Sequence, residues 1–456
     1  MRAVNCFAAA ASASVPVTPV SPSGFASWLE AQSPAIASFV KAAGFKADAG
    51  RVFALPGEGG IAGFIAGRDA KDSLWAGALA SALPEGTYRL EGLSAEELER
   101  AALAWGLGAY QFTTDKAAKR APAQLALPSG APSRETLAMI EAAYLVRDLV
   151  NTPAGDLGPE EIEAAARDLA ARHDAKFSSI RGDELLGQGF NLIHAVGRGS
   201  PRAPRLIDIS WGKASDPKLT LVGKGVAFDT GGLDIKPSSN MILMKKDMGG
   251  AAHVLGLAHV IMTAGLPVSL RVLVPAVENS VSGDAYRPSD IIKSHKGLTV
   301  EIGNTDAEGR LILADALSLA DADEPDLMID MATLTGAART ALGPELPALF
   351  TDDDAFASDL LAAGAAESDP LWRLPLWTPY AKYLESPVAD LNNAGSSGFA
   401  GAITAALFLK RFVEKAKTWA HLDIYAWSTS NGPTKSVGGE AQTLRTLFRV
   451  LKTRYS

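Results

Sequence analysis

The stretch LTVEIGNTDAEGRLILADALSLADA, Leu298 to Ala322, predicts a strand that turns directly into a helix. Apolar and polar residues alternate in LTVEI, whereas apolar residues recur at helical spacing in GRLILADAL. Between them, the octapeptide NTDAEGRL, residues 304–311, holds two carboxylates and a guanidinium. Because open α/β folds bind ligands beyond the carboxyl ends of their strands, this turn is a candidate site.

Helix capping is the alternative interpretation of the same octapeptide. Asp306 or Thr305 could accept a backbone N–H of the helix. Glu308 could favour the positive end of the helix dipole, while Arg310 pairs with one of the acids. Such caps are common, so the octapeptide alone does not decide between capping and chemistry.

The order of predicted elements indicates an α/β protein with more than one domain, since 456 residues exceed one ordinary core. From about residue 156, strand-like and helix-like segments alternate as in a sheet covered by helices. We expect a small N-terminal α/β domain, a linking helix, and a larger C-terminal domain with a central mixed sheet flanked by helices. Their predicted limits are residues 1–132, 133–155 and 156–456, and residues 116–134 are interpreted as an interdomain linker. The key predicted strands are residues 218–225, 269–277, 298–304 and 326–334, and the key predicted helices are residues 250–265 and 309–322.

Composition and charge exclude several classes of protein. Hydrophobic residues make up 47% of the chain and charged residues 21%, which is typical of a globular protein. The formal net charge of −8 gives no support for a nucleic-acid partner. No segment approaches the ~20 consecutive apolar residues of a membrane span, so we expect no membrane partner.

The cysteine content and the N-terminus bear on location. The single cysteine, Cys6, cannot form an internal disulfide, which fits a reducing compartment. The start MRAVNCFAAAASASVPV, residues 1–17, is similar to a signal peptide, but its apolar run is short, is broken by Asn5 and lacks leucine. We therefore expect a soluble, cytoplasmic protein.

A second cluster of charged residues lies in VGKGVAFDTGGLDIKPSSNMILMKKDMGGAAH, Val222 to His253. It holds Lys224, Asp229, Lys236 and Asp247 among glycines that let the backbone turn tightly and approach a ligand. It is not a phosphate-binding loop, because glycine follows Lys224 where Ser or Thr is required.

Four acids gathered at the ends of neighbouring strands would repel one another, so such a cluster requires cations. These acids are Asp229, Asp247, Asp306 and Glu308. Two divalent metals roughly 3.5 to 4 Å apart are the usual solution. The lysines are either counter-ions or, as a neutral amine beside a metal, ligands. The ligand types suit Zn, Mn, Mg or Co and do not choose among them.

The motifs of the chain resemble the leucyl aminopeptidase family of metallopeptidases, the cytosol aminopeptidases, over roughly residues 145 to 450. The segments that carry the resemblance are VGKGVAFDTGGLDIKP, KKDMGGAAH, NTDAEGRLILADAL, DMATLTGA, GAITAALFLKRFV and WAHLDI. The resemblance implies that residues 156–456 form a catalytic metallopeptidase domain. The N-terminal part resembles the family's variable domain only in size and general character.

The resemblance also implies a role for individual residues. Two divalent metals, Mn or Zn with Mg or Co as further candidates, would be held by Lys224, Asp229, Asp247, Asp306 and Glu308. Lys236 would polarise the scissile carbonyl, and Arg310 would hold a bicarbonate or an ordered water that moves the proton. A hydroxide bridging the metals would attack the carbonyl, and one metal would receive the free amine of the substrate.

Substrate binding is implied for five residues, Met244, Asp247, Thr333, Leu334 and Gly336. The chain departs from the family pattern after HLDI, where YAWSTSNGP places Tyr425 and Trp427 near the pocket wall. This departure weakens the expectation of a strict leucine preference. The implied activity is release of N-terminal amino acids, leucine and other apolar residues, from peptides by a homo-hexamer.

Two other functions compete with this interpretation. A two-metal phosphoesterase would commonly add histidines at metal spacing, whereas His253, His259 and His421 lie among apolar neighbours and predict structural roles. A non-enzymatic scaffold or DNA-binding protein would not need all five implied metal ligands, and the acidic charge offers DNA no support.

Overall fold

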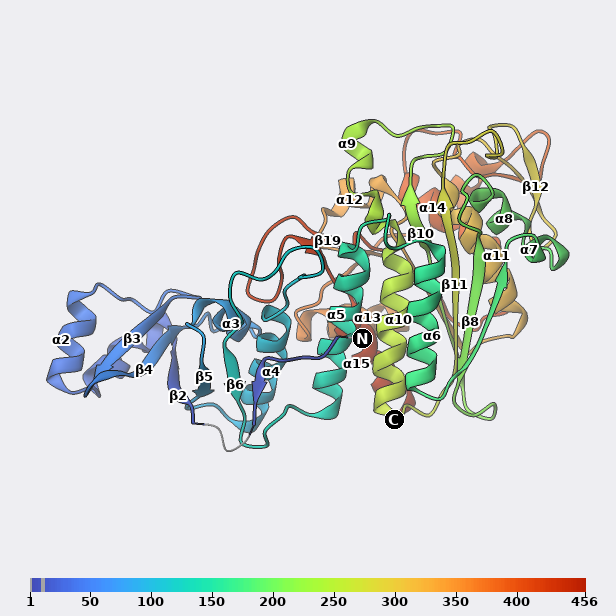
Figure 1. The fold of residues 1–456 in the computed structure, drawn as a ribbon. Coiled ribbons are helices and arrows are strands. Elements are labelled where there is room, and N and C mark those ends of the chain that lie inside the picture. Colours follow the sequence, from blue (N-terminus) through green and yellow to red (C-terminus); the bar gives the residue numbers. More distant parts are fainter. Residues whose placement is uncertain (1, 10–12) are drawn as a thin grey trace. The chain divides into compact units, whose positions relative to one another are not determined.

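A computed structural model describes residues 2–9 and 13–456 of the chain (Figure 1). The chain forms two compact units, the first made of residues 1–144 and 429–437 and the second of residues 145–428 and 438–456. The division falls inside helix α5 (Arg134–Asn151). The predicted limits of 1–132, 133–155 and 156–456 stay a prediction. Part of the alanine-rich start, residues 10–12, and Met1 lie outside the described residues.

The first unit is a mixed six-stranded sheet with strand order β1-β6-β5-β2-β4-β3. Only β3 and β4 pair in antiparallel fashion among its described strands. The strands are β1 (Phe7–Ala8), β2 (Val15–Val20), β3 (Val52–Gly57), β4 (Gly60–Gly67), β5 (Thr87–Leu90) and β6 (Gln124–Ala126). The helices are α1 (Phe25–Glu30), α2 (Pro34–Ala42), α3 (Leu79–Ala82) and α4 (Ala95–Gly108).

The predicted linker at residues 116–134 is partly wrong, because β6 lies inside it and pairs in parallel with β1 and β5. Leu125 of β6 is fully buried. The indole of Trp105 also donates a hydrogen bond of 2.9 Å to the carbonyl of Ala123, just before β6. The linker was predicted because Pro, Ser and Gly residues flank the short apolar strand β6.

The second unit contains a nine-stranded sheet, in which β9, β11, β14 and β18 run parallel. β8 is antiparallel to β11 and β7, and β15 is antiparallel to β18 but parallel to β16. The order is β16-β15-β18-β14-β9-β11-β8-β7, and β10 pairs with β11. The predicted central mixed sheet is confirmed. Its strands are β7 (Lys176–Arg181), β8 (Arg205–Trp211), β9 (Lys218–Gly223), β10 (Gly225–Asp229), β11 (Ser269–Asn279), β14 (Leu327–Ala332), β15 (Ala348–Phe350), β16 (Trp372–Arg373) and β18 (Trp419–Asp423).

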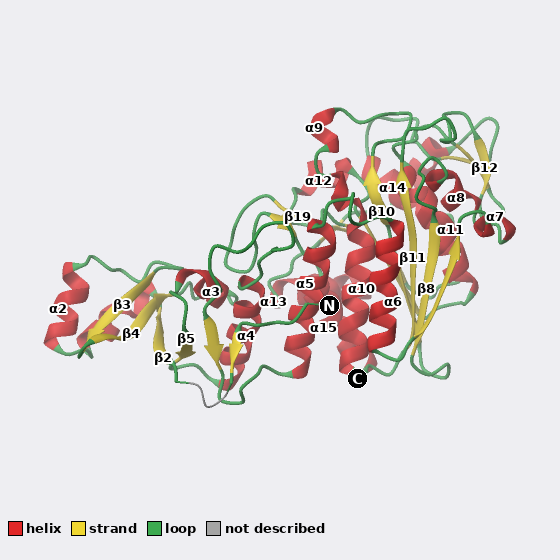
Figure 2. Ribbon diagram, viewed as in Figure 1, coloured by secondary structure: helices red, strands yellow, loops and turns green. Residues whose placement is uncertain are grey.

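Helices cover both faces of this sheet (Figure 2). One group packs against one face and contains α6 (Pro159–Arg172), α10 (Gly249–Ala264) and α15 (Leu444–Tyr455). The other contains α8 (Asn191–Gly197), α11 (Glu308–Ala322) and α14 (Gly401–Lys410). The remaining helices are α7 (Glu184–Gly187), α9 (Ser238–Met241), α12 (Gly336–Leu342) and α13 (Asp354–Ala366), with a 3-10 turn at Met244–Met248. No helix of the described residues is long and apolar enough to cross a membrane.

The strand predicted at residues 298–304 does not join the central sheet. It is β13 (Thr299–Glu301), which pairs with β12 (Ile291–Lys293) and β17 (Leu391–Asn392) in a separate three-stranded sheet. The alternating pattern correctly indicated a strand, but a pattern of this length does not specify the partner strand. The two-stranded pair β19 (Trp427–Ser428) and β20 (Gly438–Gly439) completes the fold.

One buried carboxylate ties α6 to the strands at the edge of the large sheet. Glu163 is 2% exposed and forms ion pairs with Arg167, Arg181 and Arg205, the last at 2.7 Å. Burial raises the pKa of Glu163, but the hydrogen bonds from the three arginines outweigh it and hold the pKa at about 2. Its charged form therefore stabilises the folded state.

Replacing Glu163 by Gln is expected to lower the free energy of unfolding by about 3 kcal/mol at neutral pH, since three guanidinium groups lose their anion. Because the folded pKa lies below the unfolded value of about 4.3, the stabilisation is present above that value. It is lost as the pH falls toward 2. Urea unfolding of both proteins between pH 7 and pH 3 checks this, with Glu160→Gln on the exposed side of α6 as control. If the difference in free energy of unfolding between the wild-type protein and Glu163→Gln stayed the same at low pH, the stabilising role of the Glu163 charge would be contradicted.

Candidate metal centre and substrate pocket

A cavity of about 270 Å³ opens where β10, α11, α12 and the loop after β14 meet, in the second unit. It brings together residues that are far apart in the sequence and that we had predicted to form one site. The predicted residues that line it are Lys224, Asp229, Lys236, Met244, Asp247, Asp306, Glu308, Thr333, Leu334 and Gly336.

Glycines allow the backbone to close around Lys224. This residue lies between β9 and β10, where its N–H donates to the carbonyl of Met331 at 3.0 Å and its carbonyl accepts from Ala251 at 2.8 Å. A Cβ atom on Gly223 would lie 2.7 Å from the carbonyl oxygen of Gly250. Only glycine fits at such a close approach, so the end of β9, the start of α10 and the end of β14 converge on the lysine.

The octapeptide forms a turn in which no side chain caps the following helix. Helix α11 begins at Glu308, and the residue before it, Ala307, provides no side-chain cap. Thr305 instead bonds to Asp234, accepting from its N–H at 2.9 Å and donating its own N–H to the carboxylate at 2.7 Å. Capping of the helix by the side chain of Thr305 or Asp306 was therefore wrong, because no side chain caps α11 and Thr305 holds the loop of residues 230–236 instead. Glu308 does lie in the first turn of α11, as the capping interpretation expected.

Two residues that the sequence reasoning missed hold this turn from behind. The hydroxyl of Tyr286 donates to the carbonyl of Thr305 at 2.5 Å, and the Asn279 amide donates to the same carbonyl at 3.0 Å. The Asn279 amide also donates to the carboxylate of Asp229 at 2.9 Å. Asn279 ends β11, and that position at a strand end was the signal that could have identified it.

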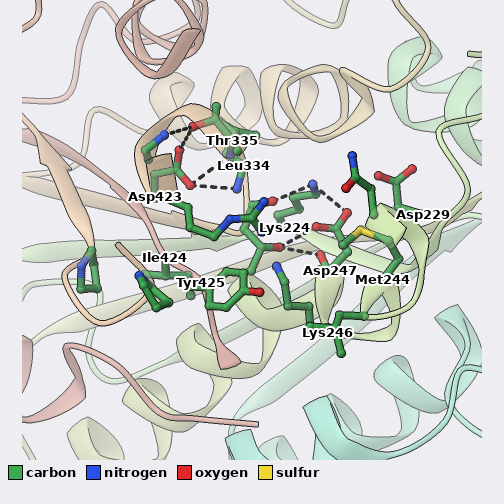
Figure 3. A pocket seen from close by; sticks show the side chains of 18 of the residues that line it. Lys224, Asp229, Met244, Lys246, Asp247, Leu334, Thr335, Asp423, Ile424 and Tyr425 are labelled. Carbon is green, nitrogen blue, oxygen red and sulfur yellow. Dashed lines mark hydrogen bonds and ion pairs between the residues drawn. The ribbon is translucent and has the colours of Figure 1, made fainter. Parts of the chain in front are cut away.

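The charged groups form one continuous network. The amine of Lys224 lies 2.8 Å from Asp247 Oδ2 and 2.8 Å from Glu308 Oε1. The amine of Lys236 lies 2.8 Å from Asp229 Oδ2 and also pairs with Asp306. All of these groups except the Asp306 and Lys236 side chains are nearly inaccessible to solvent. Figure 3 shows Lys224 beside Asp247, with Asp229 to their right.

Acids outnumber cations in this network, and the pKa values reflect the excess. Burial and the charge of Asp229 raise the pKa of Asp306 to about 6 and the pKa of Glu308 well above its usual range. Burial lowers the pKa of Lys224, but Asp247, Glu308 and Asp229 outweigh it and raise that pKa overall. The cluster therefore attracts further positive charge.

The geometry of the carboxylates fits a divalent cation. One oxygen each from Asp229, Asp306 and Glu308 lies within 4.8 Å of the others. Among the described residues, buried oxygens of Asp247, Asp306 and Glu308 receive no hydrogen bond of ordinary geometry, although lysine amines lie near them. Buried carboxylate oxygens without donors suit cation binding.

Arg310, predicted to be catalytic, is not among the residues found to line the cavity in the described chain. Its guanidinium donates to the carbonyl of Asn393 at 2.7 Å, and its Nε is buried without a hydrogen bond to the described residues. Burial lowers the pKa of Arg310 to about 10, while the charges of Glu308 and Asp423 act in the opposite direction. Arg310 lies two residues after Glu308 in α11 and is half-buried.

The loop after β14 forms the other wall of the cavity. The hydroxyl of Thr333 donates to Asp247 Oδ1 at 2.8 Å, which fixes a carboxylate of the cluster. The carboxylate of Asp423, at the end of β18, accepts from the N–H of Leu334 at 3.0 Å and from the hydroxyl of Thr335 at 2.6 Å (Figure 3). Sequence reasoning missed Asp423, although it lies in the HLDI motif.

The cavity also contains two cations that the sequence reasoning did not single out, Lys246 and Arg339. Lys246 immediately precedes Asp247, and burial lowers its pKa to about 8. Tyr425 lines the cavity as expected, whereas Trp427 is not among the lining residues found in the described chain. The sequence signal that could have identified Lys246 was its position immediately before Asp247 in the KKD motif.

The histidines make structural contacts. His253 lies 2.6 Å from the carbonyl of Gly249 and accepts from the N–H of Gln442 at 2.9 Å. His421 lies 2.5 Å from Asp330 in the core of the sheet, and His259 lies 2.9 Å from His173. None of the three lines the cavity in the part of the chain that the structure describes.

Comparison with known proteins shows the family of the chain. Residues 144–448 match the family described as the cytosol aminopeptidase family, catalytic domain, and residues 15–128 match the M17 aminopeptidase N-terminal domain. A probable cytosol aminopeptidase of Roseiflexus castenholzii is 47% identical over 297 residues, 64% of this chain and 60% of that protein. The chain thus aligns with less than two thirds of this curated relative.

Solved structures match over nearly the whole chain. The crystal structure of a cytosol aminopeptidase from Coxiella burnetii has a TM-score of 0.93 and 47% identity, covering 97% of this chain and 98% of that one. The bottromycin maturation enzyme BotP in complex with Mn has a TM-score of 0.86 and 34% identity, covering 98% and 100%. The chain belongs to the cytosol aminopeptidase family of metallo-exopeptidase hydrolases, as its motifs indicated.

Proposed function

We propose that this protein is an aminopeptidase that releases N-terminal amino acids, leucine and other apolar residues among them, from peptides. The observation that carries the proposal is the convergence of four carboxylates and two lysines on one cavity of the domain that matches the family's catalytic domain. The divalent-metal chemistry of the family requires such a cluster.

Five residues would hold two divalent cations in this cavity. Lys224, Asp229, Asp247 and Glu308 would hold one, and Asp229, Asp306 and Glu308 would hold the other. Binding of the Lys224 amine requires loss of its proton, which the charge of a cation favours. Mn is supported by the Mn complex of BotP, Zn suits the same ligands, and Mg and Co are further candidates.

The protein's own residues would position and activate the peptide. When bound, the cations would supply hydroxide at neutral pH and a ligand position for the free amine of the substrate. Lys236 would donate a hydrogen bond to the scissile carbonyl oxygen, where negative charge develops as the carbonyl is attacked. Arg310 would orient a bicarbonate or an ordered water that carries the proton to the leaving amine.

Assembly and location are part of the same proposal. Relatives are named as cytosol aminopeptidases, which supports a cytoplasmic location, and the family resemblance supports a homo-hexamer. Peptides with a free N-terminus are the proposed partners, and the net charge of −8 gives nucleic acid no support. Met244, Thr333, Leu334 and Gly336 would contact the first side chain, and Asp247 the substrate amine.

Metal-loaded protein is expected to hydrolyse Leu-p-nitroanilide, and a chelator is expected to abolish the activity. N-acetyl-Leu-p-nitroanilide should be inert, because acetylation removes the amine that the site binds. Release of p-nitroaniline measures all three reactions. Equal cleavage of the acetylated substrate would refute recognition of the free amine, and release of phosphate from an aryl phosphate instead would identify a phosphoesterase.

Lys236→Ala is expected to lower kcat by roughly 10²- to 10³-fold with metal content unchanged, since it removes one donor to the developing oxyanion. Asp247→Ala should instead lose metal, because it removes a proposed ligand. Metal analysis together with Leu-p-nitroanilide kinetics separates the two effects. Lys213→Ala, on an exposed turn, serves as control, and metal loss in Lys236→Ala would move Lys236 into the ligand set.

A further inference from the structure

Two cations in the cavity have no role in the proposed reaction. Lys246 lies in the 3-10 turn at Met244–Met248 and is 4% exposed. Arg339 lies in α12 and is exposed at the cavity edge. A lysine this deeply buried normally has an anionic partner.

Both cations lie near the ring of Tyr425, which follows β18. The amine of Lys246 is 4.6 Å from the ring centroid, and the guanidinium carbon of Arg339 is 5.1 Å from it. Figure 3 shows the amine of Lys246 beside the Tyr425 ring. An aromatic face attracts cations, but more weakly than a carboxylate does.

No carboxylate of the described residues forms an ion pair with Lys246 or Arg339. The two acids whose charges act on Lys246, Asp247 and Asp423, are engaged elsewhere. Asp247 pairs with Lys224 at 2.8 Å, and Asp423 accepts hydrogen bonds from the loop after β14. Lys246 and Arg339 also repel each other. The two cations at this end of the cavity therefore have no carboxylate paired with them among the described residues.

Metal binding would not supply an anion for Lys246 and Arg339. Two divalent cations carry four positive charges, which would balance the four carboxylates Asp229, Asp247, Asp306 and Glu308. Lys246 and Arg339 would then still be without an anion.

We propose that Lys246 and Arg339 bind the side-chain carboxylate of an acidic first residue, glutamate or aspartate, of the peptide. The inference rests on the proposed aminopeptidase function and names a substrate class beyond apolar residues. The cavity wall contains Met244, Thr333 and Gly336, the residues expected to contact the first side chain, together with both cations. The thioether of Met244 and the ring of Tyr425 suit the methylene stem of glutamate.

The test compares kcat/KM for the p-nitroanilides of α-glutamate, glutamine and leucine with metal-loaded protein. Glutamate and glutamine have the same shape and differ in charge, so their ratio isolates the carboxylate. We expect the wild-type protein to favour glutamate over glutamine by about tenfold or more, the effect of one charge-assisted hydrogen bond.

Two variants test the residues. Lys246→Met is expected to lower the glutamate-to-glutamine ratio by roughly 10- to 100-fold, and Arg339→Met, at the exposed edge, by about three- to tenfold. Lys213→Met makes the same chemical change on an exposed turn and should leave the ratio unchanged. Metal analysis of Lys246→Met shows whether the neighbouring Asp247 still binds metal. Because Arg339 lies outside the core, the glutamate-to-glutamine ratio of Arg339→Met tests the inference without disturbing the fold.

Each outcome decides the inference. Hydrolysis of the leucine and glutamine substrates without a preference for glutamate would overturn it and leave the proposed function standing. Failure to hydrolyse any of the three would overturn both. The same ratio of kcat/KM can be measured for the dipeptides Leu-Glu and Leu-Gln, which differ at the second residue of the peptide. If Lys246→Met altered only that ratio, the two cations would bind the side chain of the second residue, and their assignment to the first residue would be wrong.

Discussion

The mutual repulsion of four carboxylates is the constraint on which the site depends. Asp229, Asp247 and Glu308 are each at most 3% exposed, so water cannot screen their charges. Lys224 and Lys236 offset only part of the repulsion, and the raised pKa values of Asp306 and Glu308 show what remains. A divalent cation would remove the conflict, and the proposed function depends on this.

The fold provides this cluster by bringing short loops together at one edge of a rigid sheet. Lys224 immediately precedes β10 and Asp229 is its last residue, and the start of α10 packs against the lysine backbone through glycines. The turn before α11 is held by Tyr286 and Asn279 rather than by a helix cap. Fixed backbone positions suit catalysis, because little reorganisation remains when the substrate binds.

Much of this arrangement could be predicted from the sequence, because strand ends, glycine pairs and acids at fixed spacing carry local signals. The five implied metal ligands and Lys236 do line one cavity. Pairing between distant strands carries no such signal, so β13 was assigned to the wrong sheet and β6 was hidden in a predicted linker. The contacts of Lys246 and Arg339 with the ring of Tyr425 join segments that are far apart in the sequence, so no single motif predicts them.

Anomalous diffraction from crystals soaked in Mn²⁺ would show whether the four carboxylates hold cations, because it locates the cations without reference to activity. We expect two anomalous peaks in the cavity, one contacting Lys224 and Asp247 and the other contacting Asp306, with Asp229 and Glu308 shared. A single peak, or peaks that lie away from these carboxylates, would contradict it.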